Sequence, residues 1–200
     1  MKIVMSSERF VKGIGFCFIM IIMLSCSNKA RYEEMVSDGL ASGERYDSLF
    51  LGISLGMSDS AFYTHCWKLN KEEKVYQGGG NMSVLYKMKD ELASPAAMEF
   101  YPAFVNGKIA KMPVTFYYEG WAPWNKDLSV DNLQLDVLKL LKKWYGADFL
   151  AIEHPVRGFA YVKVDGNRQI TLYRNDDKSV VVYFRDLTVT NEKEETDILN

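Results

Sequence analysis

Two segments with helical spacing each precede a series of short segments with strand patterns. The first runs from Ser58 to about Leu69 and the second from Ser129 to Tyr145. Each leading serine can accept a hydrogen bond from an amide of the first helical turn. Apolar residues recur every three or four positions along the second segment: Val130, Leu133, Val137, Leu140, Leu141 and Trp144. Because helices and sheets each bury one face, this order predicts an α+β protein with helices packed on antiparallel strands.

The strand patterns form two groups, one after each predicted helix. The first group covers Met82–Lys89, Ala97–Val105 and Lys108–Glu119, and the second covers Phe149–Glu153, Phe159–Val164, Gln169–Arg174 and Val180–Thr188. Asn106-Gly107 is a strong signal for a two-residue hairpin turn. Pro102 and Pro113 lack the amide hydrogen that a central strand needs, so we expect their strands to lie at edges or to contain bulges.

These patterns divide the chain into two tandem helix-plus-sheet units, over residues 48–124 and 125–190. Residues 26–47 are polar, with glycine and serine interspersed, and are predicted to form a tether. A short helix around Ala30–Val36 is compatible with that segment. Residues 191–200 are acidic and are predicted to be a solvated, disordered tail.

The N-terminus has the pattern of a targeting segment. A basic leader precedes the run Gly13–Leu24, in which every residue is apolar or glycine. A bilayer-spanning helix needs about 20 such residues, so this run is too short, whereas it suits a signal peptide. Ser25-Cys26 follows, and a small residue before a cysteine at this point resembles a lipoprotein signal. An uncleaved anchor and an ordinary signal peptide with a chance cysteine are the alternatives.

The lipoprotein resemblance implies a processed and acylated protein. Residues 1–25 would be removed, and Cys26 would carry diacylglycerol on its thiol and a fatty acid such as palmitate on its amine. The expected location is the cell envelope of a Gram-negative bacterium, as an outer-membrane lipoprotein facing the periplasm or the surface. The expected partner is the membrane itself, through the lipid on Cys26.

A second resemblance lies at the start of the first unit. The segment Ile53–Phe62, ISLGMSDSAF, is similar to the opening of small envelope lipoproteins of the SmpA/OmlA type, which help outer-membrane barrel assembly. Tandem copies of that unit resemble the β-lactamase-inhibitor-protein fold, in which each half lays helices on an antiparallel sheet. The second unit of this chain lacks the Gly-Met-Ser start. The resemblance therefore implies a fold, and it does not by itself imply the barrel-assembly role.

Composition excludes several function classes. Lys and Arg total 24 against 26 Asp and Glu, so there is no basic surplus for a nucleic-acid binder. Cys17, Cys26 and Cys66 match neither a zinc site nor a disulfide framework. With only His65 and His154 in the chain, a multi-histidine metal centre is excluded. We find no cofactor motif and no enzyme signature, and Cys66 is expected to be a buried apolar residue.

The segment from Phe100 to Trp124 is rich in aromatic residues, with eight of them. Tyr117 must point opposite to its neighbours Phe116 and Tyr118 on a strand, so one set can serve the core and the other a second surface. Trp121 and Trp124 follow on a predicted loop between the units. Exposed rings of this kind stack on sugars or anchor a protein partner. The alternative is that they hold the two units together.

Three functional hypotheses follow. The first is a lipid-anchored, non-catalytic envelope protein that binds another envelope protein or has an assembly role through a sheet face. The second is a glycan- or small-ligand-binding lipoprotein that uses Tyr117, Trp121 and Trp124. The third and weakest is a hydrolase, which would need a deep pocket holding His154 with a carboxylate.

Overall fold

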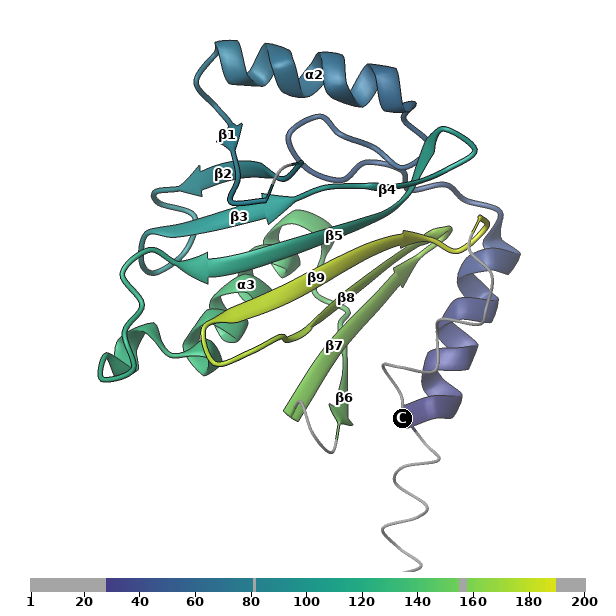
Figure 1. The fold of residues 1–200 in the computed structure, drawn as a ribbon. Coiled ribbons are helices and arrows are strands. Elements are labelled where there is room, and N and C mark those ends of the chain that lie inside the picture. Colours follow the sequence, from purple (N-terminus) through teal and green to yellow (C-terminus); the bar gives the residue numbers. More distant parts are fainter. Residues whose placement is uncertain (1–27, 81, 155–157, 190–200) are drawn as a thin grey trace, which may run out of the picture.

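The computed structural model describes residues 28–80, 82–154 and 158–189 of the chain (Figure 1). The predicted signal peptide, Cys26 and the acidic tail 191–200 lie outside the described residues, as does the side chain of His154. Within the described part, no helix combines the length and apolar character needed to cross a bilayer.

The described strands form one nine-stranded sheet with the order β1-β2-β3-β5-β9-β8-β7-β6, and β4 pairs with β5. Every pairing in it is antiparallel. The strands are β1 (Tyr76–Gln77), β2 (Val84–Met88), β3 (Ala96–Phe100), β4 (Ala103–Val105), β5 (Lys108–Tyr118), β6 (Leu150–His154), β7 (Gly158–Asp165), β8 (Arg168–Arg174) and β9 (Ser179–Asp186). The α+β class predicted from the sequence is therefore confirmed.

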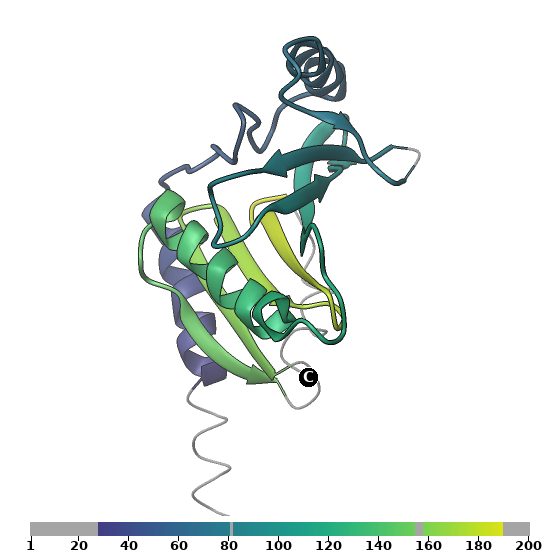
Figure 2. The ribbon, with the colours of Figure 1, turned by 90° about the vertical axis from the view of Figure 1, so that its left-hand side faces the viewer.

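Two labelled helices accompany this sheet. Helix α2 (Asp59–Lys71) begins after the N-cap Ser58, and α3 (Val130–Tyr145) begins after the N-cap Ser129. A short 3-10 helix, η1 (Lys126–Leu128), precedes α3. Helix α3 crosses one face of the sheet and contacts β5, β8 and β9 (Figures 1 and 2). We call this face of the sheet the α3 face.

The main core lies between α3 and the α3 face. Strand β5 alternates buried and half-buried residues, because successive side chains point to opposite faces. Its buried set is Met112, Val114, Phe116 and Tyr118, which join Leu133, Val137 and Leu141 of α3 in one apolar cluster. Tyr117 points to the other face, as the sequence predicts.

The position of Pro113 differs from the predicted edge strand. It lies in the centre of the sheet, between β9 and the β3–β4 side, so the prediction of an edge strand is wrong. The bulge alternative fits better, because the chain leaves the ladder between β3 and β4, around Pro102, and the register shifts between Ala103 and Phe104. On that side Pro113 falls between the paired residues Lys111 and Val114.

Residues 28–42, within the predicted tether, form a helix that packs on the sheet face opposite to α3 (Figure 2). Tyr32 is only 4% exposed and packs with Leu150, Ile152 and Val162 of β6 and β7. Its hydroxyl donates to Gln169 Oε1 at 3.1 Å. The three residues facing the sheet, Tyr32, Met35 and Val36, have helical spacing.

Residues 43–57 connect this helix to α2, and we call them the strap. Leu49, Phe50, Ile53 and Leu55 of the strap are buried in the main core. The strap also closes hydrogen bonds with itself, from the amide of Leu55 to the carbonyl of Asp47 at 2.8 Å and from the amide of Leu49 to the carbonyl of Ile53 at 2.9 Å. It is therefore a structural element of the core rather than a surface loop.

Ion pairs and amide contacts fix the strap to the end of β9 and to the turn between β7 and β8. Arg45 contacts Asp186 at 3.0 Å and Asp47 at 2.8 Å. The Asn167 side chain accepts a hydrogen bond from the amide of Tyr46 at 2.7 Å and donates one to Asp47 at 2.9 Å. Because Asp186 and Asn167 are each 2% exposed, these contacts tie the strap to the interior.

We expect stability to depend on pH through Asp186. Burial opposes its ionisation, but hydrogen bonds from Thr188, Arg45 and Asn167 outweigh burial and lower its pKa. A lowered pKa stabilises the fold above the unfolded value of about 4, and this contribution is lost as pH falls through the folded value. Urea unfolding at pH 7 and pH 3 tests this. The destabilisation by Asp186→Asn should be larger at pH 7, and an equal effect at both would contradict it.

Candidate functional site

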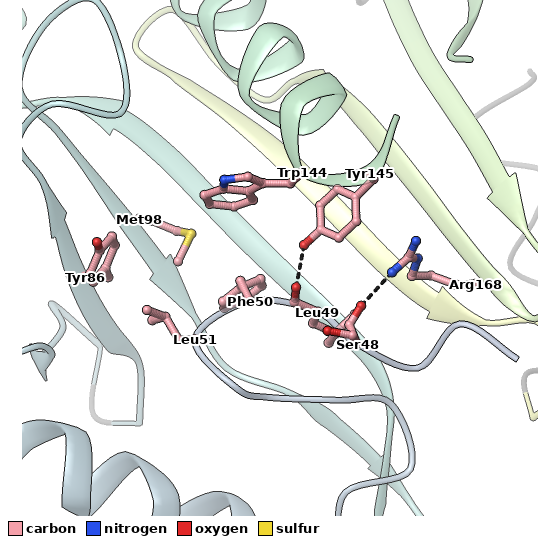
Figure 3. A pocket seen from close by; sticks show the side chains of 9 residues that line it. All are labelled: Ser48, Leu49, Phe50, Leu51, Tyr86, Met98, Trp144, Tyr145 and Arg168. Atoms are coloured by element: carbon pink, nitrogen blue, oxygen red, sulfur yellow. Dashed lines mark hydrogen bonds between the residues drawn. The ribbon is translucent and has the colours of Figure 1, made fainter. Parts of the chain in front are cut away.

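A concavity with a volume of about 400 Å³ lies beside the strap (Figure 3). We call it the strap pocket. Nine residues line it: Ser48, Leu49, Phe50 and Leu51 of the strap, Tyr86 of β2, Met98 of β3, Trp144 and Tyr145 of α3, and Arg168 of β8. Its volume falls within the range of small-molecule sites.

The position of α3 explains why a hollow forms here. The helix covers β5, β8 and β9, and it ends at Tyr145, before Gly146, which adopts a positive φ of 93°. Strands β2 and β3 therefore extend beyond the helix. The strap fills part of the remaining space, since Phe50 packs edge-on against Phe100 of β3 with ring centroids 5.0 Å apart.

The apolar part of the pocket is built from facing side chains. Tyr86 and Met98 are register partners on adjacent strands, so their side chains lie side by side on one face. In Figure 3 the Met98 side chain lies between those of Tyr86 and Trp144. Trp144 is 38% exposed, so its ring is accessible at the rim. Aromatic and thioether groups arranged in this way provide contacts for a flat apolar group.

Hydrogen bonds fix the opposite end of the pocket. Tyr145 donates its hydroxyl hydrogen to the carbonyl of Leu49 at 2.8 Å, and Arg168 donates from Nη1 to the carbonyl of Ser48 at 2.6 Å (Figure 3). Arg168 is 6% exposed, and its guanidinium carbon lies 4.6 Å from the centre of the Tyr145 ring. Nη2 of Arg168 contacts Asp165 at 2.8 Å. The cation is thus neutralised and held against an aromatic face.

Both pocket tyrosines keep their hydroxyl protons at neutral pH. Burial and the hydrogen bond that Tyr86 donates to Glu91 at 2.6 Å raise the pKa of Tyr86 to about 12. Burial also raises the pKa of Tyr145, against the effect of Arg168. The pocket therefore offers neutral aromatic rings, a thioether, aliphatic carbon and one paired guanidinium, which is chemistry for holding a ligand.

The aromatic residues singled out from the sequence lie elsewhere. Tyr117 is half-buried on the face opposite to α3 and donates to Glu99 Oε1 at 2.9 Å. Trp121 is half-buried and Trp124 is 84% exposed, both on the segment that joins β5 to η1. None of the three lines the strap pocket. A role for these residues in binding stays a prediction.

The remaining members of the aromatic segment belong to the interior or to α2. Phe100, Phe116 and Tyr118 are core residues, as the alternation predicts for the last two. Tyr101 and Phe104 contact Phe62 of α2, with ring centroids 6.3 and 6.0 Å apart. The high aromatic content is therefore mostly a packing feature.

Cys66 is the free thiol in the part of the chain that the structure describes. Cys66 is half-buried, and burial raises its pKa to about 11, which keeps it protonated and weakly nucleophilic at neutral pH. His65 lies 2.7 Å from the carbonyl of Leu51 through Nε2. Within the described residues, no group of three or more His, Cys, Asp or Glu side chains is arranged to hold a metal ion.

Comparison with known proteins found no matching family model, no matching curated protein and no matching solved structure. The residues of the strap pocket must therefore be interpreted from their own chemistry. The sequence analysis did not predict this pocket. Trp144 and Tyr145 at the end of a capped helix were a partial signal, because two large aromatic rings next to a helix-terminating glycine must pack beyond the last turn.

Proposed function

We propose that this chain is a lipid-anchored cell-envelope protein with a non-catalytic role, and that its strap pocket binds a small apolar or aromatic group. The observation that carries the binding role is the pocket of about 400 Å³ with Trp144 and Tyr86 at its sides and Met98 between them. The lipoprotein-like signal at Cys26 supports the anchor. The location we propose is the outer membrane of a Gram-negative bacterium.

The binding role can be tested with N-phenyl-1-naphthylamine, a neutral fluorescent probe made of apolar rings. The sample is the chain from residue 26 onward with Cys26→Ser, which contains every described residue but no lipid that would itself take up the probe. We expect saturable, one-to-one binding. Trp144→Ala should weaken binding about tenfold, the equivalent of about 1.4 kcal/mol, because the ring at the rim is lost.

Trp124→Ala is the matched control, because it removes an exposed tryptophan outside the pocket. It should leave probe binding unchanged. Absence of saturable binding, or equal weakening by both substitutions, would contradict the proposed site.

Glycan binding is a second candidate, supported by the 84% exposure of Trp124. Tyr117 and Trp121 precede it in the chain, and exposed indole rings stack on sugars. Intrinsic fluorescence that changes on addition of a glycan, and no longer does so in Trp124→Ala, would favour this function over the strap pocket.

The tandem-unit interpretation belongs to the same proposal. Helix α2 is followed by strands up to β5, and α3 is followed by strands up to β9. The last strands of the two halves, β5 and β9, pair antiparallel at the centre of the sheet. From each of them, progressively earlier strands of the same half follow toward the edge, β3, β2 and β1 on one side and β8, β7 and β6 on the other. This arrangement supports two related units joined edge to edge, as in the β-lactamase-inhibitor-protein resemblance.

A further inference from the structure

We propose that the end of the domain where helix 28–42 begins and β6 ends lies directly against lipid headgroups, so that the bilayer holds the domain in one orientation. This inference rests on the proposed lipid anchor at Cys26. It concerns how the folded part is placed relative to the membrane, which the anchor alone does not determine.

Helix 28–42 is part of the folded domain. Tyr32 is buried against β6 and β7 and bonded to Gln169 of β8. Near the other end of the helix, Gly39 approaches the sheet so closely that a Cβ there would lie 2.8 Å from a Val164 methyl carbon and 2.9 Å from the carbonyl oxygen of Gly166. The helix is therefore attached along its length.

The strap gives helix 28–42 no hinge. Immediately after it, Arg45 contacts Asp186, and the Tyr46 amide donates to Asn167. Leu49 and Phe50 then enter the main core. The helix is thus fixed through its own face and through the segment that follows it, and it cannot swing away as a unit.

The chain between the proposed anchor and helix 28–42 is short. Residue 28 is already helical, and only Ser27 lies between it and Cys26, so the two residue-to-residue steps span at most about 7 Å. A flexible tether over residues 26–47 would instead separate its ends by roughly 25 Å on average. The domain therefore has no room to stand off from the bilayer.

The surface in contact with the headgroups is the end of the domain where the helix begins. Helix 28–42 begins at the end of the molecule where β6 ends, whereas α2 lies at the opposite end (Figures 1 and 2). Exposed Lys29 and Arg31 lie in the first turns of the helix, where Lys29 also pairs with exposed Glu33 at 4.0 Å. Phe159, 51% exposed, lies at the start of β7 next to the end of β6. Cationic and aromatic side chains suit a headgroup surface. The strap begins at the far end of the helix, about 22 Å away, so the strap pocket is held off the bilayer.

Fluorescence energy transfer on vesicles tests this orientation. The acylated protein carries Cys66→Ala and one reporter cysteine, either Glu153→Cys on β6 or Lys68→Cys on α2, labelled with a donor dye. The vesicles contain phosphatidylethanolamine and phosphatidylglycerol with a headgroup-labelled acceptor lipid. We expect several-fold more transfer from position 153 than from position 68. Equal transfer from the two positions would overturn the proposal.

A variant with a Gly/Ser linker inserted between residues 27 and 28 is the matched control. About twelve inserted residues separate their ends by roughly 20 Å and leave the fold and Cys26 intact. The difference between positions 153 and 68 should then largely disappear; a difference that persists would show that the short connection does not set the orientation, and would overturn the proposal.

The anchor is checked separately, by incorporation of an alkynyl fatty acid with Cys26→Ala as the control. Incorporation that does not depend on Cys26, or none at all, would contradict the proposed anchor. Cys26-dependent incorporation with equal transfer from both reporters would contradict only the orientation. The two failures are therefore distinguishable.

Discussion

Replacing Gly166 with alanine is expected to lower the free energy of unfolding by about 3 kcal/mol and to weaken probe binding in the strap pocket. Gly166 adopts φ +52°, and a Cβ there would lie 2.2 Å from the carbonyl oxygen of Glu44. Since that oxygen belongs to the strap backbone, the strap must move. The hydrogen bonds of Tyr46 with Asn167 and of Ser48 with Arg168 would then be lost.

Gly107→Ala is the control for backbone strain alone. Gly107 has a similar φ of +69°, but nothing lies within 4 Å of a Cβ built there. It should cost only the left-handed strain of about 1 kcal/mol and leave probe binding unchanged. Urea unfolding curves and probe titrations of the two variants measure the difference. Equal losses of stability would show that the strap is not clamped at Gly166.

Local sequence signals predicted the elements on the α3 face well. The Ser129 cap and the recurrence of apolar residues every three or four positions after it predicted α3, which begins at Val130 and ends at Tyr145. The Asn106-Gly107 pair gave the turn between β4 and β5, where both residues adopt positive φ, 51° and 69°. These features depend on neighbours in the chain, so the sequence contains the information locally.

The strap pocket could not be predicted in this way, because it is assembled from five separate segments. Trp144 shares the spacing of the α3 core residues, and it lines a pocket only because α3 ends beside the strap and strands β2 and β3. For residues 28–42 the sequence predicted a tether and allowed only a short helix around Ala30–Val36, whereas the helix spans the whole range. Its sheet-facing residues, Tyr32, Met35 and Val36, are few among polar neighbours, so composition favours a tether although contacts with β6 and β7 stabilise a helix.

Arg168→Met is the second substitution with a large expected effect, a loss of about 3 kcal/mol in the free energy of unfolding. It leaves the carbonyl of Ser48 without the Arg168 donor and takes one partner from Asp165, whose other contact is Lys163 at 2.8 Å. Arg168→Lys should fall between, because a lysine keeps the charge but cannot reach both oxygens with a planar fork. Midpoints of urea unfolding at constant m-value measure these differences.

Arg174→Met is the matched control, because Arg174 is the last residue of β8 and does not line the strap pocket. It pairs with Asp131 at the surface, where the two side chains are 35% and 69% exposed, and its replacement should cost less than about 1 kcal/mol. The comparison separates two explanations for the buried cation. If Arg168→Met left stability unchanged but weakened probe binding, the strap would not depend on the guanidinium, and Arg168 would act on the pocket directly. If stability and probe binding both fall, Arg168 acts on the pocket through the strap, because the strap that it holds also forms one side of the pocket.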